Sequence, residues 1–233
     1  MNKIILASVF SSAFILSACS SSSDDVAQII GDEFVNISGQ ITDLNDAPLS
    51  GVAIEGVYTD PGAPLNPTTT SAATTGNFSL PVIKGDAFYL RGTKATYTTL
   101  NSAKGALSVD EAGFDIGIPT EIEAQGVIDA AYGAGTALAT QAWLVVDVSD
   151  AAGEVNNQTI TISVPFDKEV YTACDGSDSG ASATNGAPCS PDRQGPMYIA
   201  SFNSTTEAQV TVGGETQTAP IRMGEITYLE FEQ

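Results

Sequence analysis

The only residues in this sequence that could carry out acid–base hydrolysis are paired carboxylates. The chain contains no His, and it carries 28 Asp and Glu residues against eight Lys and Arg. Without His, Ser-His-Asp and Cys-His catalysis cannot be built in the usual way, and the commonest zinc ligand is missing. No Gly-rich phosphate loop followed by Lys-Ser or Lys-Thr occurs either. We therefore assign no catalytic residue and expect a protein that is not an enzyme.

Two pairs of acids stand two residues apart, Glu121 with Glu123 and Glu230 with Glu232. If both pairs lie on strands, the members of each pair share one face. Two carboxylates that flank a glycosidic bond can hydrolyse it. Acids on an edge strand, however, commonly serve only to prevent aggregation. A carboxylate-based hydrolase is therefore the third of three hypotheses.

Two acidic loops offer the oxygen ligands that a hard cation such as Ca²⁺ prefers. The candidates are Asp175, Ser177 and Asp178 in one loop, and Asp147, Asp150 and Glu154 in the other. Neither group matches the spacing of an EF-hand. Solvated acidic turns explain both groups more simply. A calcium-binding envelope protein is the second hypothesis, and no other cofactor is expected.

The amino terminus carries export and anchoring signals. Lys3 precedes an apolar run from Ile4 to Leu16, which is shorter than the ~20 residues of a membrane-spanning helix and typical of a signal peptide. Leu16-Ser17-Ala18-Cys19 then resembles the lipobox of bacterial lipoproteins. The resemblance implies cleavage before Cys19 and lipidation of its thiol. Ser20 follows the cysteine, which favours the outer membrane, and residues 20–25 predict a flexible tether.

The other two of the three cysteines, Cys174 and Cys189, remain as a pair. In an oxidising compartment such a pair predicts a disulfide. It would contribute ~3 kcal/mol in the chain-entropy model. The residues between them, 175–188, are nearly all small or polar and cannot form a core.

Charge restricts the partners. A formal net charge of −20 argues against nucleic acid and against contact between the body and an anionic lipid surface. Four basic residues gather between Lys84 and Lys104, and none lies between Gly105 and Asp167. This asymmetry either orients the molecule towards a partner or reflects chance variation of the surface.

Period-two alternation of apolar and polar residues dominates the body and predicts strands. It occurs in residues 35–42, 78–82, 159–164 and 226–231. Residues 139–148, which include Trp143, are apolar on both faces and predict a central strand. Pro61, Pro64 and Pro67 disfavour any strand within 61–73. No stretch after the signal shows convincing helical periodicity, so we predict an all-β protein.

Residues 35–123 resemble the carboxypeptidase regulatory-like, or transthyretin-like, β-sandwich. The matching residues are Ile37-Ser38-Gly39-Gln40-Ile41-Thr42-Asp43, Ala47-Pro48-Leu49-Ser50-Gly51-Val52-Ala53-Ile54, Thr75-Gly76-Asn77-Phe78-Ser79-Leu80-Pro81-Val82 and Gly85. Ala47 and Thr74-Thr75 depart from the residues that the family often has there. The resemblance implies an accessory module without catalysis of its own.

The fold prediction is one or two antiparallel immunoglobulin-like or transthyretin-like sandwiches after a cleaved signal peptide and a tether. The predicted segments are the signal peptide 1–18, the tether 19–34, the first sandwich 35–123, and a second sandwich-like domain 124–233 with the disulfide loop. Gly117–Glu123 and Gly224–Glu230 are similar in sequence. This similarity leaves open whether the second domain repeats the first.

The leading hypothesis is a lipid-anchored protein of the bacterial cell envelope that acts as a non-catalytic binding or structural module. Its expected partners are the membrane, through the anchor, and a protein or glycan at the envelope. Six tyrosines are scattered and predict half-buried strand residues with the hydroxyl in water: Tyr58, Tyr89, Tyr97, Tyr132, Tyr171 and Tyr198. The loops 61–75 and 174–189 are the preferred sites of partner contact.

Overall fold

The structure is a computed structural model, and it describes residues 33–59, 66–149, 160–171 and 198–232. The predicted signal peptide, Cys19 and the predicted tether up to residue 32 lie outside the described residues. So do Cys174, Cys189, Asp175, Ser177, Asp178, Asp150 and Glu154. The described elements belong to one unit, Glu33–Gln233.

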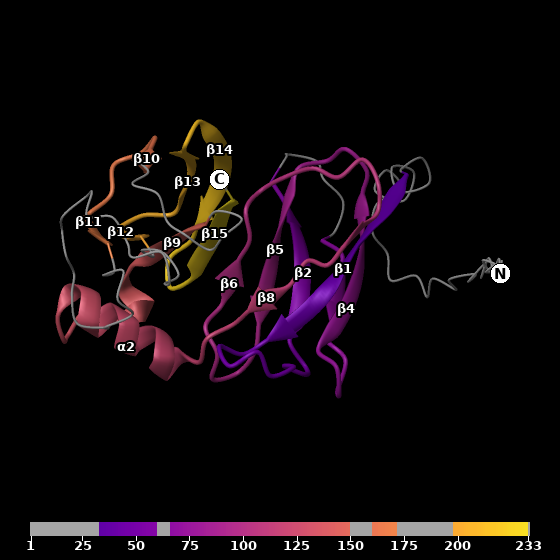
Figure 1. Cartoon of the computed structure of the whole chain (residues 1–233), viewed down its shortest axis with the longest axis horizontal. Helices are drawn as coiled ribbons and strands as arrows, with labels where there is room; N and C mark the ends of the chain where they lie inside the picture. Colours follow the sequence, from indigo (N-terminus) through magenta and orange to yellow (C-terminus); the bar gives the residue numbers. More distant parts are fainter. Residues whose placement is uncertain (1–32, 60–65, 150–159, 172–197, 233) are drawn as a thin grey trace, which may run out of the picture. The chain divides into compact units, whose positions relative to one another are not determined.

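Within this unit, the described residues form three sheets and one α-helix, whose arrangement is drawn in Figure 1. The first sheet has the strand order β4-β1-β7, with β8 also pairing with β1. The second has eight strands in the order β11-β12-β9-β15-β6-β5-β2-β3, and the third has the order β10-β13-β14. The strands are β1 (Phe34–Thr42), β2 (Ala53–Tyr58), β3 (Thr68–Thr70), β4 (Asn77–Ile83), β5 (Phe88–Thr93), β6 (Leu100–Asn101), β7 (Glu111–Ala112), β8 (Ile116–Gly117), β9 (Ala142–Ser149), β10 (Thr161–Ile162), β11 (Lys168–Tyr171), β12 (Tyr198–Phe202), β13 (Thr206–Val212), β14 (Glu215–Ile221) and β15 (Ile226–Glu232).

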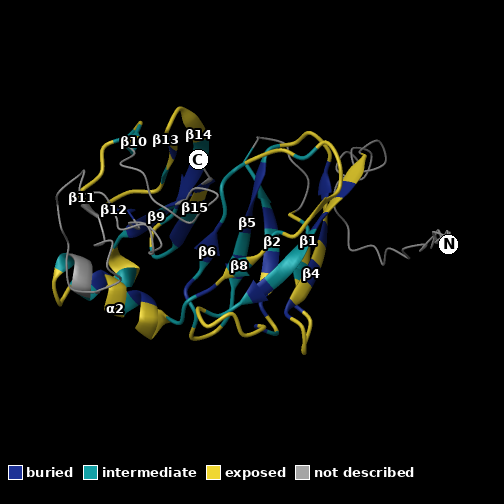
Figure 2. Ribbon diagram, in the orientation of Figure 1, coloured by how far each residue is buried: buried dark blue, intermediate teal, exposed yellow. Residues whose placement is uncertain are grey.

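Two hydrophobic cores lie on opposite faces of the eight-stranded sheet. On one face, the sheet containing β1 and β4 and the helix α2 (Glu121–Tyr132) bury the first core, which includes Ile54, Leu90 and Trp143. On the other face, β10, β13 and β14 pack against β9, β12 and β15. Figure 2 shows buried residues along the strands that enclose the two cores. The prediction of an all-β sandwich is confirmed.

The alternating pattern works as expected in most strands. Phe78, Leu80 and Val82 are buried on β4, while the residues between them are exposed. Trp143 lies on β9, between β12 and β15 in the sheet, and neighbouring residues on both faces of this strand are buried. The predicted central strand is therefore confirmed. The turn from β1 to β2 contains Gly51 at φ +69°, a conformation that glycine adopts without steric cost.

Two predictions about secondary structure are wrong. Residues 121–132 form the helix α2, although no helix was expected after the signal. A strand, β3, lies within 61–73, where the prolines argued against one. It is possible because it begins immediately after Pro67, at the edge of the sheet, where a missing N–H costs nothing. The carbonyl of Pro67 still accepts a hydrogen bond from the N–H of Gly56 at 2.9 Å.

The eight-stranded sheet is continuous across both halves of the chain. β15 pairs in parallel with β6 through Ile226 and Leu100, and on its other side it pairs in parallel with β9. Side chains reinforce this junction, because Arg91 contacts Glu225 at 2.5 Å and Lys104 contacts Glu207 at 3.3 Å. Part of the basic cluster between Lys84 and Lys104 thus neutralises carboxylates of the C-terminal strands.

Arg91 and Asn101 both bond the largely buried carboxylate of Glu225, which is 14% exposed. Burial alone would lower the pKa of the Arg91 guanidinium. The hydrogen bond and the charge of Glu225 outweigh that effect, so the pKa is raised from its ordinary value. The Arg91 guanidinium therefore stays charged at any physiological pH.

Candidate functional site

The start of α2 is fixed by a reciprocal cap. The Thr120 hydroxyl accepts a hydrogen bond from the Glu123 N–H at 3.2 Å, and the Glu123 carboxylate accepts one from the Thr120 N–H at 2.8 Å. Such a box satisfies two amides that have no partner within the helix. Hydrogen bonds from the Thr120 hydroxyl, and then from its backbone N–H, lower the pKa of Glu123. The helix ends at Gly133, at φ +87°.

The helix packs on the sheet through a narrow stripe. Ala124 and Ile128, one turn apart, are buried in the first core. Ile122 points outwards and is 85% exposed, the most exposed large apolar side chain among the described residues. Gln125 and Asp129 lie between these two directions, along one edge of the helix.

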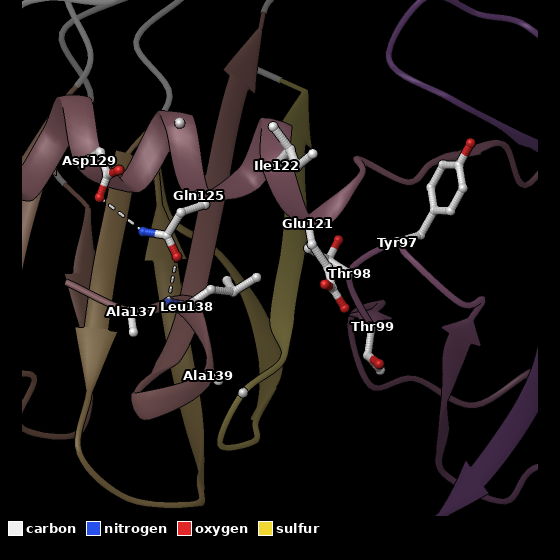
Figure 3. Close-up of a pocket in the computed structure, with 12 residues that line it drawn as sticks. Tyr97, Thr98, Thr99, Glu121, Ile122, Gln125, Asp129, Ala137, Leu138 and Ala139 are labelled. Atoms are coloured by element: carbon white, nitrogen blue, oxygen red, sulfur yellow. Dashed lines mark hydrogen bonds between the residues drawn. The ribbon is translucent and has the colours of Figure 1, made fainter. Parts of the chain in front are cut away.

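A groove of about 720 Å³ runs along this edge (Figure 3). The helix contributes Glu121, Ile122, Gln125, Gly126 and Asp129 to its lining, and the rest comes from Tyr97, Thr98, Thr99, Ala137, Leu138, Ala139 and Gly224. The volume falls within the range of small-ligand and peptide-side-chain sites.

Hydrogen bonds hold the groove in shape. The Gln125 amide donates to the Asp129 carboxylate at 2.9 Å and to the Thr136 carbonyl at 2.7 Å, and its oxygen accepts from the Leu138 N–H at 2.9 Å. Leu138 begins the 3₁₀-helix η1 (Leu138–Thr140), and the Trp143 indole N–H donates to its carbonyl at 2.9 Å. Figure 3 shows Gln125 between Asp129 and Leu138. Both walls are therefore tied to the sheet and to each other.

At the helix start, the groove is bounded by a turn with an unusual backbone. Thr96 has φ +68°, a conformation that is rare for a β-branched residue. Its carbonyl accepts a hydrogen bond from the Glu121 N–H at 3.0 Å, which joins the turn to the helix. The next residue, Tyr97, is half-buried, and the Lys94 ammonium lies 5.6 Å from its ring centroid. Lys94 also donates to the Ser50 carbonyl.

The groove is acidic. Glu121 and Asp129 line it, and no Lys or Arg does. Among the described residues, no cation pairs with either carboxylate, and Asp129 accepts only the Gln125 amide. The two acids are eight residues apart on one helix, which separates their Cα atoms by ~12 Å. The pair that Glu121 was expected to form with Glu123 does not exist, because Glu123 bonds Thr120 while Glu121 faces the groove.

The other expected pair of acids lies elsewhere. Glu230 is exposed on β15, and its carbonyl accepts from the Gln217 amide at 2.7 Å. The side chain of Glu232 is outside the described residues. Asp147, from one of the two calcium candidates, accepts a hydrogen bond from the Tyr228 hydroxyl at 2.9 Å. Burial, and then the charge of Asp147, raise the pKa of Tyr228.

Among the described residues, no three acids, cysteines or histidines converge as metal ligands would. Nor does that part of the chain contain a helix with the length and hydropathy needed to span a bilayer. Asp175, Ser177 and Asp178, like the Cys174–Cys189 pair, lie outside the described residues.

Tyr58 is a half-buried strand residue as expected, but four other tyrosines differ from that pattern. Tyr89 and Tyr198 are buried rather than half-buried. Tyr97 and Tyr132 lie outside the strands, and the Tyr132 hydroxyl donates to the Ile199 carbonyl at 2.8 Å.

The sequence analysis named Tyr97 and Glu121 but did not predict that they line the same groove. The motif Pro119-Thr120-x-x-Glu123, a capping signature, would have indicated the helix that joins them.

Comparisons with known proteins assign no family to the chain. No family model and no curated protein matches the chain. Solved structures that resemble it include the minor pilin GBS52 of Streptococcus agalactiae, at 10% identity and TM-score 0.27, covering 85% of this chain and 94% of the pilin. A streptococcal ancillary pilin matches at 9% identity and TM-score 0.30, covering 86% of this chain and 62% of that one. The 3-chlorocatechol 1,2-dioxygenase of Rhodococcus opacus matches at 12% identity and TM-score 0.30. The match covers 39% of this chain and 61% of the dioxygenase.

Proposed function

We propose that the chain is an exported lipoprotein of the bacterial cell envelope, anchored in the outer membrane by lipid on Cys19. Its β-sandwich body is a non-catalytic binding or structural module. The observation that carries the anchor is the sequence Leu16-Ser17-Ala18-Cys19 after a short apolar run. Two or more acyl chains hold a protein stably at a membrane, whereas one does so only marginally.

The groove along α2 supports a binding role for the body. It is preorganised by backbone and amide hydrogen bonds, and it presents the highly exposed Ile122 together with two carboxylates that have no cationic partner in the part of the chain that the structure describes. Its acids do not face each other across the groove as the two carboxylates of a glycosidase do. Binding therefore fits this geometry better than hydrolysis does.

Replacing Cys19 tests the anchor. In cells fed labelled palmitate, the wild-type protein should carry label and sediment with membranes. Cys19→Ser should lose the label and appear in the soluble fraction, because the acceptor thiol is gone. Cys174→Ser is the matched control and should keep both properties. A Cys19→Ser protein that still carries palmitate would refute the anchor.

The same control variant tests the proposed disulfide between Cys174 and Cys189. The lipidated protein should resist thiol alkylation until a reductant is added, and it should then take up two equivalents. Cys174→Ser should react without reductant, through Cys189. It should also lose ~3 kcal/mol of unfolding free energy. Alkylation of the unreduced wild-type protein would contradict the pairing.

A further inference from the structure

We propose that the α2 groove binds a peptide segment that carries both a Lys or Arg and an apolar residue. This inference rests on the proposed binding function and names the chemistry of the partner. Three features of the described residues support it: the charge of the groove, the position of Asp129 on the helix, and the exposure of Ile122.

The position of Asp129 indicates a cation. It lies in the last turn of α2, where the helix macrodipole is negative and where the helix has no basic residue. A carboxylate there is electrostatically unfavourable, and the neutral Gln125 amide does not compensate its charge. A partner's ammonium or guanidinium placed here would interact with both Asp129 and the carbonyl end of the helix. Glu121 is different, because it stands in the first turn, where the dipole favours an acid.

Ile122 indicates an apolar contact along the same edge of the helix, about 10 Å from Asp129. Its side chain is 85% exposed, while Leu138 on the facing wall is half-buried. An apolar side chain inserted between the two would remove surface from water on both sides. Thr99 lines the groove further along. A peptide that alternates basic and apolar side chains can satisfy both requirements at once, which neither a simple cation nor a lipid tail can.

Charge argues against the other occupants. A second copy of the chain would bring together two bodies that each carry a formal charge near −20. Nucleic acids and anionic lipid headgroups are repelled for the same reason. The acidic lining therefore complements a basic peptide.

The test measures binding of labelled, end-capped nonapeptides to the full-length protein by fluorescence anisotropy. The probe alternates Leu and Lys, and the comparison peptides alternate Leu with Glu and Ser with Lys. Near-physiological salt shortens the Debye length to ~8 Å, so that general attraction to the acidic body is screened. The Leu-Lys peptide should bind, and the other two should bind weakly or not at all.

Four variants locate the binding. Ile122→Ser and Asp129→Asn should each weaken binding about fivefold or more. Their matched controls are Val109→Ser, at another exposed apolar residue, and Asp86→Asn, at another exposed acid. The controls should change affinity less than twofold. Asp129→Asn keeps an oxygen for the Gln125 amide and removes the unfavourable charge, so its Tm should stay equal or rise while binding falls.

Several results would overturn the inference. If the groove variants and their controls lose the same amount of affinity for the Leu-Lys peptide, the attraction is nonspecific. Comparable binding of the Leu-Glu peptide would remove the role of charge. A dimer in sedimentation velocity that Ile122→Ser dissociates would make a second copy the occupant, and cellohexaose binding without peptide binding would make it a glycan. If the protein carries palmitate but does not bind the peptide, this inference alone is refuted. If it binds the peptide but carries no palmitate, the anchor alone is refuted.

Discussion

Two acidic segments of this protein use their carboxylates in opposite ways. In residues 110–117, Asp110 and Asp115 each accept a hydrogen bond from a backbone N–H of β1, at 2.8 and 3.0 Å. In α2, Glu121 and Asp129 face a solvent-filled groove without cationic partners among the described residues. The acids of the first segment complete a sheet, whereas those of the groove line a surface and pair with no cation among the described residues. Net charge alone does not distinguish the two uses.

The hydrogen bonds that Asp110 and Asp115 accept from β1 depend on a bulge beside Gly39. β7 pairs in parallel with β1 through Ile37 and Glu111, and β8 pairs with it through Ile41 and Ile116. The segment from Glu111 to Ile116 is therefore one residue longer than the stretch of β1 from Ile37 to Ile41 that it accompanies. The extra residue brings Phe114 against Gly39, and the Phe114 N–H donates to the Ser38 carbonyl at 3.2 Å. A glycine is required at this point by space rather than by its φ angle.

Gly39→Ala should therefore have the largest effect on stability. The added Cβ would lie 1.9 Å from the Phe114 carbonyl oxygen, so the crossing segment must move away from β1. We expect a loss of roughly 3 kcal/mol in unfolding free energy, measured by urea denaturation. Gly105→Ala is the matched control, because nothing lies within 4 Å of its added Cβ. Equal losses in both variants would show that the close approach is not what stabilises this region.

Asp115→Ala should have a smaller effect. It removes the acceptor of the Gln40 N–H but leaves the bulge in place. Because the site is exposed, water can replace the carboxylate, and we expect a loss of about 1 kcal/mol. Glu121→Ala in the groove is the comparison, and it should change stability much less. If Glu121→Ala cost as much, the contrast between structural and free acids would fail.

The strands could be predicted because their signal is local. Period-two burial fixes which residues of β1 and β4 enter the core, and the apolar stretch around Trp143 fixes a central strand. The turn at Gly51 also follows from neighbouring residues. The parallel contacts of β7, β8 and β15 could not be predicted, because pairing over two residues or across the chain leaves no periodic pattern.

The groove was missed for a related reason. Its helix exposes Ile122 and buries only a narrow stripe through Ala124 and Ile128, so the apolar periodicity is weak. The capping box at Thr120 and Glu123 was the readable signal. The contribution of Thr98 and Leu138 depends on tertiary packing, which a single sequence does not specify.

Acid titration should separate Glu123, the structural acid of α2, from Glu121. The folded-state pKa of Glu123 lies below its ordinary value of 4.5, so its contribution to stability is complete above pH 4.5. That contribution should disappear as the pH falls through the lower, folded-state pKa. The amide resonance of Thr120, which donates to Glu123, should report the transition in NMR spectra.

The effect should be small and confined to the first turn, because Ala124 and Ile128 keep the helix docked on the sheet. Glu123→Gln retains an oxygen for the Thr120 N–H but cannot titrate, so the transition should vanish while the helix persists. Glu121→Gln should leave the transition unchanged, since Glu121 takes no part in the cap. A midpoint at or above pH 4.5 would mean that the hydrogen bonds to Glu123 do not favour its charged form. In that case α2 would contain no carboxylate that resembles those bound to β1.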